Sequence, residues 1–349
     1  MIVGVLGGGQ LGRMLALAGT PLGLRFHFLD PARDAPARDV GTLHVGAYDD
    51  PERLERLAKN AAVVTYEFEN VPVEAARRLE ALVPVLPSPA ALEAAQDRLT
   101  EKRLFVRLGI PTPRFGETLA EVGLPAVVKT RRLGYDGKGQ RVLRSEAEAA
   151  AAARELDGPL LYEELIEFER ELAILAVRST AGETAYYPLV ETEQRDGILR
   201  SARVPACPEL QGQAEELGGR LLAELDYAGV LALELFETGG RLLANELAPR
   251  VHNSGHWTIE GAVTSQFENH LRAVLGLPLG STAALGPAAL VNLIGGVPPL
   301  EELLAVPGAH VHLYGKPPRP GRKLGHVTLV GAGADGVARV VALAEHAAR

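Results

Sequence analysis

The chain has 349 residues, 47% of them hydrophobic and 23% charged, which predicts a soluble globular protein of two or three domains. Its net charge of −8 argues against a general nucleic-acid-binding protein, which needs a basic face. Cys207 is the single cysteine, which excludes an intrachain disulfide and a cysteine-built zinc site and fits a reducing cytoplasm. Neither a signal peptide nor a membrane-spanning segment is expected, because the N-terminus has no basic region and no apolar run is long enough.

Residues 1–95 alternate strand and helix signals. A helix is expected at 11–18, and apolar runs predict strands at 2–6, 24–30, 61–66 and 83–86. This alternation indicates a parallel sheet with helices on both faces, in a Rossmann-like domain. The Pro- and Ala-rich residues that follow are predicted to form a connection, and residues 96–108 a helix that Gly109 and Pro111 end.

A glycine pattern opens the first helix. Gly7, Gly9 and Gly12 follow the first strand, and Asp30 ends the next one, as in a dinucleotide-binding turn. An NAD-dependent dehydrogenase is therefore an alternative interpretation. The pattern itself predicts only backbone amides aimed at an anion, and the glycines could equally serve close strand–helix packing.

Two acids follow the third strand of this domain. Glu67 and Glu69 stand where the carboxyl end of a parallel strand places ligand-binding groups, so they could accept hydrogen bonds from sugar hydroxyls. The alternative is that one of them complements the dipole of a helix N-terminus.

From residue 125 the pattern changes to strands joined by hairpins. Strands at 126–130 and 140–143 flank a glycine-rich loop, which lacks the Gly-Lys-Ser/Thr and the helix of a P-loop. Such a loop can cover phosphates as a lid, with Lys129 placing its ammonium on a phosphate. A helix is predicted at 146–156, and further strands at 171–178 and 185–191.

The strand around 161–166 runs into a linker. Backbone groups of a linker between lobes can meet the edge of a purine, and the acid beyond it, Glu171, can hold ribose hydroxyls. Taken alone, this pattern has low specificity.

A second hairpin carries opposed acids. Strands at 231–237 and 241–247 flank a Thr-Gly-Gly turn, and Glu234 and Glu246 are equidistant from Gly240. In such a hairpin their Cβ atoms lie roughly 5 Å apart, and the two carboxylates repel unless a cation sits between them. Carboxylate oxygens suit Mg²⁺, whereas the alternative is two exposed surface acids.

Two further segments concentrate groups that bind anions. Residues 245–258 combine an acid, amides, an arginine, two histidines and the only tryptophan. Residues 280–349 predict a small closing domain with short strands, and its Gly/Pro-rich loop gathers Lys316, Arg319, Arg322 and Lys323. Arginine grips phosphate through paired hydrogen bonds, so the loop predicts an anion site rather than a solubilising surface.

Together these segments resemble the ATP-grasp superfamily and, within it, the 5-(carboxyamino)imidazole ribonucleotide synthetase family of purine biosynthesis. The resemblance runs nearly end to end, with matching motifs at residues 7–14, 65–72, 96–98, 129–140, 245–258 and 314–327. It implies an α/β and α+β architecture, an ATP-grasp fold with an N-terminal parallel-sheet domain and a small β-rich C-terminal domain. The implied boundaries are 1–95, 96–279 with a lid subdomain at about 111–163, and 280–349.

The resemblance also implies site residues. ATP contacts are implied for Arg98, Lys129, Gly134, Tyr135, Asp136, Gly137, Lys138, Gly139, Gln140, Glu163, Glu164, Leu165, Ile166, Glu171, Gln194, Asn245 and Glu246. Glu234 and Glu246 are the implied ligands of two Mg²⁺ ions. Substrate contacts are implied for Gly9, Gln10, Leu11, Glu67, Glu69, Asn70, Tyr135, Lys316, Arg319, Arg322 and Lys323. Catalytic roles are implied for Arg250, His256, Asn245, Lys316 and Asp136, and Gln194 stands where the family usually has a histidine.

The implied activity is the carboxylation of 5-aminoimidazole ribonucleotide by ATP and bicarbonate through carboxyphosphate, in a cytoplasmic homodimer. ADP and phosphate are released, and the product is 5-(carboxyamino)imidazole ribonucleotide. A non-catalytic nucleotide sensor is disfavoured, because both candidate metal carboxylates and Lys129 are present.

Overall fold

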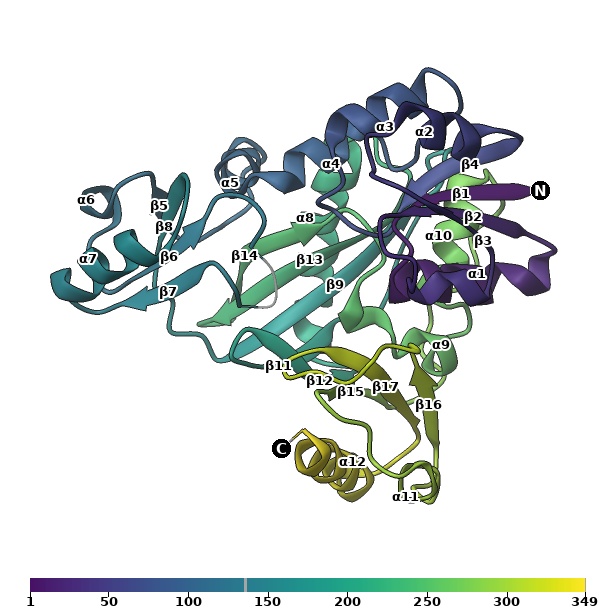
Figure 1. The fold of residues 1–349 in the computed structure, drawn as a ribbon. Coiled ribbons are helices and arrows are strands. Elements are labelled where there is room, and N and C mark those ends of the chain that lie inside the picture. Colours follow the sequence, from purple (N-terminus) through teal and green to yellow (C-terminus); the bar gives the residue numbers. More distant parts are fainter. Residues whose placement is uncertain (135–136, 349) are drawn as a thin grey trace.

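The computed structural model describes residues 1–134 and 137–348 (Figure 1). Within these residues the strands form three sheets: a four-stranded N-terminal sheet, a four-stranded sheet in a projecting lobe, and a nine-stranded central sheet. Short 3-10 turns lie at Thr20–Leu22, Pro36–Asp39, Pro208–Leu210 and Asn253–Gly255. In the described part of the chain, no helix is both long enough and apolar enough to cross a bilayer.

The N-terminal sheet is parallel, as predicted, with strand order β3-β2-β1-β4. Its strands are β1 (Ile2–Leu6), β2 (Arg25–Asp30), β3 (Thr42–Val45) and β4 (Ala61–Tyr66), with helices α1 (Gln10–Gly19), α2 (Pro51–Ala58) and α3 (Val73–Glu80). The strand predicted at 83–86 was wrong, because Val85 forms only an isolated bridge with Val64. The sheet has β3 as its additional strand instead. β3 is a half-exposed edge strand without an apolar run, so the hydrophobic pattern does not predict it.

The connection predicted after this sheet is a helix. α4 (Pro89–Gln96) begins at Ser88, whose hydroxyl accepts from the amide of Ala91, and α5 (Arg98–Arg107) begins at Asp97, which accepts from two further amides. Proline is favoured at the first helical position, so Pro89 starts the helix rather than interrupting one. The single helix predicted at 96–108 therefore starts two residues later, behind the Asp97 cap.

The projecting lobe is a small antiparallel sheet of order β5-β8-β6-β7 with two helices on it (Figure 1). Its elements are β5 (Phe115–Gly116), α6 (Leu119–Val122), β6 (Ala126–Thr130), β7 (Gln140–Leu143), α7 (Glu146–Glu155) and β8 (Leu160–Glu164). A core of its own holds it together: Val122, Ala126, Val128, Leu143 and Ala152. The glycine-rich loop between β6 and β7 therefore sits on a separately packed unit.

The central sheet has the order β14-β13-β9-β11-β12-β15-β17-β16, with β10 beside β9. Its strands are β9 (Arg170–Arg178), β10 (Thr184–Tyr186), β11 (Val190–Arg195), β12 (Ile198–Val204), β13 (Gly229–Thr238), β14 (Arg241–Ala248), β15 (Ala288–Ile294), β16 (Ala309–Leu313) and β17 (Lys323–Val330). The strand predicted at 185–191 is divided between β10 and β11. Of the C-terminal strands, β15 pairs with β12, β17 with β15 and β16 with β17, so they extend the central sheet instead of forming a separate one.

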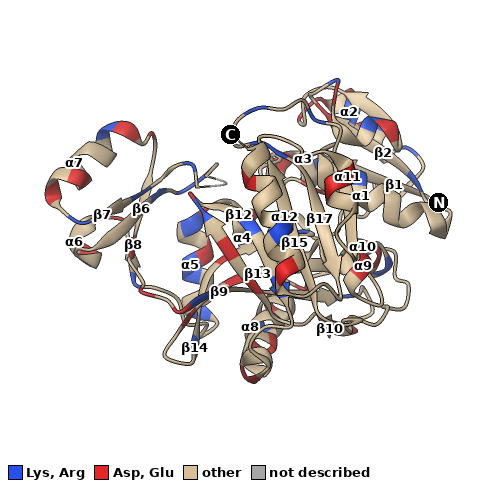
Figure 2. Ribbon diagram, turned by 90° about the horizontal axis from the view of Figure 1, so that it is seen from below, with Lys and Arg blue, Asp and Glu red and all other residues tan. Residues whose placement is uncertain are grey.

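Helices cover both faces of this sheet. They are α8 (Gln211–Glu224), α9 (Thr258–Gly261), α10 (Gln266–Val274), α11 (Leu300–Leu304) and α12 (Ala334–Ala347). Alternate residues of β9 explain the layering: Leu172, Ile174 and Ala176 pack in the core beneath α8, whereas Leu175 and Val177 pack in the core that contains α10 and the N-terminal sheet. Figure 2 shows acidic and basic residues on several helices, and α7 carries both kinds.

Candidate active site

A cleft of about 720 Å³ lies where the N-terminal sheet, the glycine-rich loop, the central sheet and the C-terminal strands meet. Most of its lining had been predicted as site residues: Gln10, Leu11, Glu67, Glu69, Gly134, Lys138, Gln194, Glu234, Glu246, Arg250, Lys316, Arg319, Arg322 and Lys323. Residues separated by more than 300 positions thus meet in one cavity. A neighbouring pocket of about 50 Å³ holds Asn70 and Arg98.

The glycine turn at the start of α1 is filled by the protein's own carboxylate. Glu67 accepts hydrogen bonds from the amides of Gly9, Leu11 and Gly12 at 2.8, 3.2 and 3.3 Å. A Cβ atom on Gly7 or Gly9 would lie 2.7 or 2.6 Å from this side chain, so both glycines are needed for its approach. Burial raises the pKa of Glu67, and these amide donors counteract part of the rise.

This arrangement removes the physical basis of the dehydrogenase interpretation. The helix N-terminus that would bind a pyrophosphate already has its anion. Asp30, the acid that would hold a ribose, instead accepts from the amide of Gly8 at 2.8 Å and from the hydroxyl of Tyr48 at 3.1 Å. Of the two interpretations of Glu67, helix capping is the one the contacts show, although its side chain also lines the cleft.

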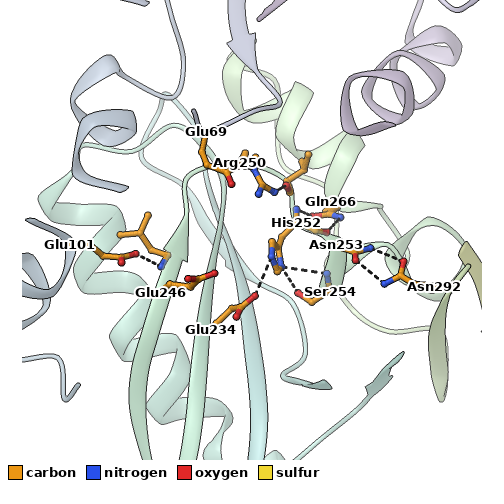
Figure 3. Close-up of polar contacts among 12 residues, drawn as sticks. Glu69, Glu101, Glu234, Glu246, Arg250, His252, Asn253, Ser254, Gln266 and Asn292 are labelled. Carbon is orange, nitrogen blue, oxygen red and sulfur yellow. Dashed lines mark hydrogen bonds and ion pairs between the residues drawn. The ribbon is translucent and has the colours of Figure 1, made fainter. Parts of the chain in front are cut away.

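The Glu234 and Glu246 carboxylates face one another across the β13–β14 pair, as predicted (Figure 3). The predicted geometry omitted one feature. Near the turn the pairing joins Leu235 to Ala244, so a regular hairpin would place Asn245 opposite Glu234. A one-residue bulge at Asn245 shifts the register and brings Glu246 into that position.

The two carboxylates have very different proton affinities. Burial and the nearby Glu246 raise the pKa of Glu234 to about 8. Burial would also raise the pKa of Glu246, but Arg98 and Lys129 lower it to about 2. Arg98 Nη1 lies 2.5 Å from Glu246 Oε2, whereas Glu234 Oε1 lies 3.3 Å from Nε2 of His252.

This donor set fits Mg²⁺. Both ligand candidates are carboxylates, and their sharing of one buried site is costly without a cation. Among the described residues no group of three or more His, Cys, Asp or Glu side chains could hold a metal ion. The Glu234 and Glu246 carboxylates would supply two oxygen ligands, and water and phosphate would fill the remaining positions, which is the usual Mg²⁺ arrangement at nucleotides.

The ammonium group of Lys129 is oriented by a buried acid, Glu163. Its Nζ donates to Glu163 Oε2 at 3.1 Å and to Asn245 Oδ1 at 3.3 Å. Although burial would raise the pKa of Glu163, Lys102 and Lys129 lower it to about 2, so the carboxylate is ionised. The Glu163 side chain therefore supports Lys129. The predicted purine hinge concerns the backbone groups of residues 163–166, and it stays a prediction.

Lys102 was not among the predicted site residues. It is fully buried and lies 3.3 Å from the same Glu163 oxygen. The sequence offers one signal for its importance, which is that lysines are few in this chain. Its burial in α5 is known only from the structure.

The two histidines of the motif after β14 lie in different places: His252 lines the cleft, and His256 is buried in the core. Arg250 lines the cleft, and its Nε donates to the carboxylate of Glu69. His252 also lines the cleft, and burial followed by Arg250 lowers its pKa to about 3, so it is neutral. His256 is completely buried against Phe267 and His326 and does not reach the cleft. His252 was missed, although it belongs to the same predicted segment.

The basic loop between β16 and β17 forms the opposite wall. Lys316, Arg319, Arg322 and Lys323 all line the cleft, and the Lys316 ammonium donates to the side-chain amide of Gln10. The loop thus joins the C-terminal strands to the start of α1, and it places four cations in an acidic protein around one cavity.

Several other predicted residues do not line this cleft: Gly9 at the start of α1, Gly137 and Gly139 before β7, Gln140 at the start of β7, Leu165 and Ile166 after β8, and Glu171 in β9. Glu164 is committed to an ion pair with Arg114 at 3.0 Å. Tyr135 and Asp136, together with the roles predicted for them, lie outside the described residues.

A projecting antiparallel lobe over a long central sheet, with a carboxylate pair and a lysine between them, defines an ATP-grasp protein. Family models agree: the ATP-grasp domain matches residues 105–267, the ribonucleotide synthetase preATP-grasp domain residues 1–96, and the phosphoribosylaminoimidazole carboxylase C-terminal domain residues 288–339. The chain belongs to the N5-carboxyaminoimidazole ribonucleotide synthase family of ligases.

Three relatives illustrate the similarity. The N5-carboxyaminoimidazole ribonucleotide synthase of Pseudomonas aeruginosa is 54% identical over 340 residues, which cover 94% of each chain. The crystal structure of the synthetase from Thermus thermophilus superposes with a TM-score of 0.94 at 56% identity, covering 98% of both chains. The Aspergillus clavatus synthase in complex with ADP and 5-aminoimidazole ribonucleotide gives a TM-score of 0.91 at 32% identity, covering 99% and 98%.

Proposed function

We infer that this protein uses ATP and bicarbonate to carboxylate 5-aminoimidazole ribonucleotide, releasing ADP and phosphate, in purine biosynthesis. One observation carries the inference: the Glu234/Glu246 pair and the basic loop with Lys316 and Arg322 line the same cleft. One wall suits a nucleotide with its metal, and the other suits the phosphate of a second substrate. One relative, the Aspergillus clavatus synthase, was crystallised in complex with ADP and that ribonucleotide.

The nucleotide end is built for phosphate. Lys129 and Arg98 supply cations, and the loop that contains Gly134 and Lys138 borders the cleft as a cover. Glu234 and Glu246 would hold Mg²⁺, which neutralises phosphate charge when bound. ATP and Mg²⁺ are therefore the proposed nucleotide and metal, with two ions as the expected number.

The acceptor end is built for the ribonucleotide. Lys316, Arg319 and Arg322 face its phosphate, and Gln10 lies beside them on α1. Arg250 lines the same cleft, its Nε donates to the Glu69 carboxylate, and its guanidinium suits the bicarbonate-derived anion.

The chemistry has two transfers. A bicarbonate oxygen attacks the γ-phosphorus of ATP, the bond to the β-phosphate oxygen breaks, and ADP and carboxyphosphate result. The exocyclic amine then attacks the carboxyl carbon, phosphate leaves, and the amine gives up a proton. Phosphoryl transfer needs mainly positioning and charge neutralisation, which Lys129 and Arg250 provide, while the glycine-rich loop keeps water from the labile acyl phosphate.

ADP release, measured with each substrate omitted in turn, tests the inference. We expect ADP formation at full rate only when bicarbonate and 5-aminoimidazole ribonucleotide are both present, with the carboxylated product appearing in step. ADP formation at the same rate without the ribonucleotide would contradict the assignment.

Buried Cys207 supports a reducing cytoplasm as the setting. A homodimer remains part of the proposal, and light scattering measures it.

A further inference from the structure

β14 carries Asn245 and Glu246, and it stands at one end of the strand order of the central sheet. Only one side of its backbone pairs with β13, so the other side needs partners of another kind. Helix α5 and the residues after it supply them. The amide of Ala244 donates to the carbonyl of Pro111 at 2.7 Å. The amide of Leu247 donates to Glu101 at 2.6 Å, and Figure 3 shows Glu101 beside Glu246.

Lys102 holds the carbonyls of the same stretch. Its Nζ lies 2.7 Å from the carbonyl oxygen of Asn245, 3.3 Å from that of Ala244 and 3.1 Å from the hydroxyl of Thr112. The side chain is 1% exposed. A buried ammonium is costly unless its protons are all used, and a neutral hydrogen-bonding group would cap a strand edge at lower cost. The charge therefore indicates a purpose beyond capping.

The first consequence concerns the bulge. Asn245 is the extra residue that turns Glu246 to face Glu234. A bulge is held in place only by local contacts, and a one-residue slip would place Asn245 opposite Glu234 and direct Glu246 elsewhere. Because Lys102 donates to the carbonyls of Ala244 and Asn245, which flank the Cα atom of Asn245, it fixes the position at which the register shifts.

The second consequence concerns Lys129. Lys102 and Lys129 both contact Oε2 of Glu163, at 3.3 and 3.1 Å, and Oε1 of Glu163 has no hydrogen-bond partner among the described residues. A buried carboxylate between two lysines stays ionised because both are near it. Lys102 thus supports the anion that orients Lys129.

We propose that Lys102 is a positioning residue for the nucleotide–metal site, fixing the bulge that aligns Glu246 with Glu234 and supporting Glu163 beneath Lys129. The inference rests on the proposed ATP·Mg²⁺ site. It assigns to α5 a part in metal affinity, which a purely structural brace would lack. Lys102 itself does not line the cleft and, by this proposal, touches no substrate.

The test is the Mg²⁺ requirement of nucleotide binding, measured without turnover. The melting temperature is followed at fixed ADP over a Mg²⁺ titration, for the wild type, for Lys102→Met and for Leu104→Ala. Leu104 lies on the same helix in the buried core, and its apolar side chain cannot hydrogen-bond the carbonyls at the bulge, so its truncation lowers stability and leaves these hydrogen bonds in place. We expect Lys102→Met to raise the half-saturating Mg²⁺ concentration about 10- to 100-fold, the effect usual for groups that orient metal ligands.

Leu104→Ala should melt lower than the wild type at an unchanged half-saturating concentration. A Lys102→Met protein that melts lower but has the wild-type Mg²⁺ requirement would overturn the proposal and leave Lys102 as a brace. A wild type that shows no Mg²⁺-dependent stabilisation by ADP would instead refute the proposed nucleotide site itself.

Thr112→Val serves if Lys102→Met does not fold. It removes the hydroxyl that donates to the Ala244 carbonyl at 2.8 Å and accepts from Lys102, while keeping the shape of the side chain. We expect a severalfold rise in the half-saturating Mg²⁺ concentration. An unchanged value would count against the proposal.

Discussion

At the scale of single residues, the two candidate metal ligands differ in how they are held. Glu246 is paired with Arg98, a cation that a metal ion must share or displace. Glu234 faces a neutral histidine, His252, and lacks such a cation at hydrogen-bonding distance among the described ion pairs. The two acids therefore contribute unequally to the stability of the metal-free protein.

Replacing either acid by glutamine should greatly reduce turnover. We expect Glu234→Gln and Glu246→Gln each to lower kcat by roughly 10²-fold or more, because several kcal/mol of metal-ion stabilisation is lost. Without metal, Glu246→Gln should lower the free energy of unfolding by about 1–2 kcal/mol, since it weakens the Arg98 pair, whereas Glu234→Gln should not. Steady-state kinetics and denaturant unfolding in a chelator measure both. Near-normal activity of both variants at limiting Mg²⁺ would refute the ligand assignment.

The basic loop yields a second prediction at this scale. Arg322→Ala should raise the KM for 5-aminoimidazole ribonucleotide about ten- to hundred-fold and leave the KM for ATP nearly unchanged. Losing one charged hydrogen-bonding partner costs roughly 1.5–3 kcal/mol. Arg141→Ala is the matched control, because Arg141 is an exposed arginine paired with Glu155 away from the cleft. An equal loss for both substrates would place Arg322 elsewhere in the mechanism.

At the scale of elements, one buried histidine joins the N-terminal sheet to the central sheet. His270 of α10 accepts from the amide of Val230 in β13 through Nδ1 at 3.1 Å, so Nε2 carries the proton toward Thr65 of β4, 2.8 Å away. Burial lowers the pKa of His270 from 6.5 to about 4. Protonation of Nδ1 would remove the acceptor and break the hydrogen bond between Val230 and His270.

The sign of the pH dependence follows. Between pH 6.5 and about 4 the unfolded chain binds a proton at His270 that the folded protein does not, so stability falls as pH falls through this window. The full effect is roughly 3 kcal/mol, since each pKa unit is worth about 1.4 kcal/mol. Denaturant unfolding at pH 7 and pH 4.5 should show this loss, and His270→Gln should show a smaller one. Equal pH slopes for the two proteins would contradict it.

The elements also show what the sequence could and could not predict. The Glu234–Glu246 pairing was predicted correctly, but the bulge at Asn245 that produces it depends on contacts from α5, which no local pattern reports. The sequence predicts a connection where α4 lies, because Pro87 and Pro89 are typical of loops, whereas Pro89 in fact starts the helix. The burial of His256 and the exposure of His252 to the cleft were not separable from the sequence, because both belong to one motif and only packing distinguishes them.

At the scale of the whole molecule, ligand binding separates the two classes of enzyme that the N-terminal glycines suggested. ATP·Mg²⁺ should raise the melting temperature, and NAD should not, because only a ligand that binds the native state stabilises it. At a ligand concentration of 100 times Kd the gain is about 2.7 kcal/mol. Thermal melts with each ligand distinguish the two classes of enzyme. A melting temperature that rises with NAD alone would support the dehydrogenase interpretation.

The overall architecture followed from the sequence more readily than the site did. Alternating apolar runs identified the parallel sheet, and the motifs from distant parts of the chain marked the cleft wall that they now line. Contacts between side chains of distant elements could not be predicted from the sequence. The Lys102–Glu163 pair joins α5 to β8 through the interior, and neither residue lies in a pattern that predicts the other.

Glu67 changes what the first glycine pattern of this chain means. Its carboxylate follows β4 and accepts from three amides at the start of α1, so the N-terminal domain neutralises this helix terminus with its own side chain. The close approach of this side chain accounts for the glycines at positions 7 and 9. In this chain the pattern therefore reflects an intramolecular fit, and it needs no dinucleotide to explain it.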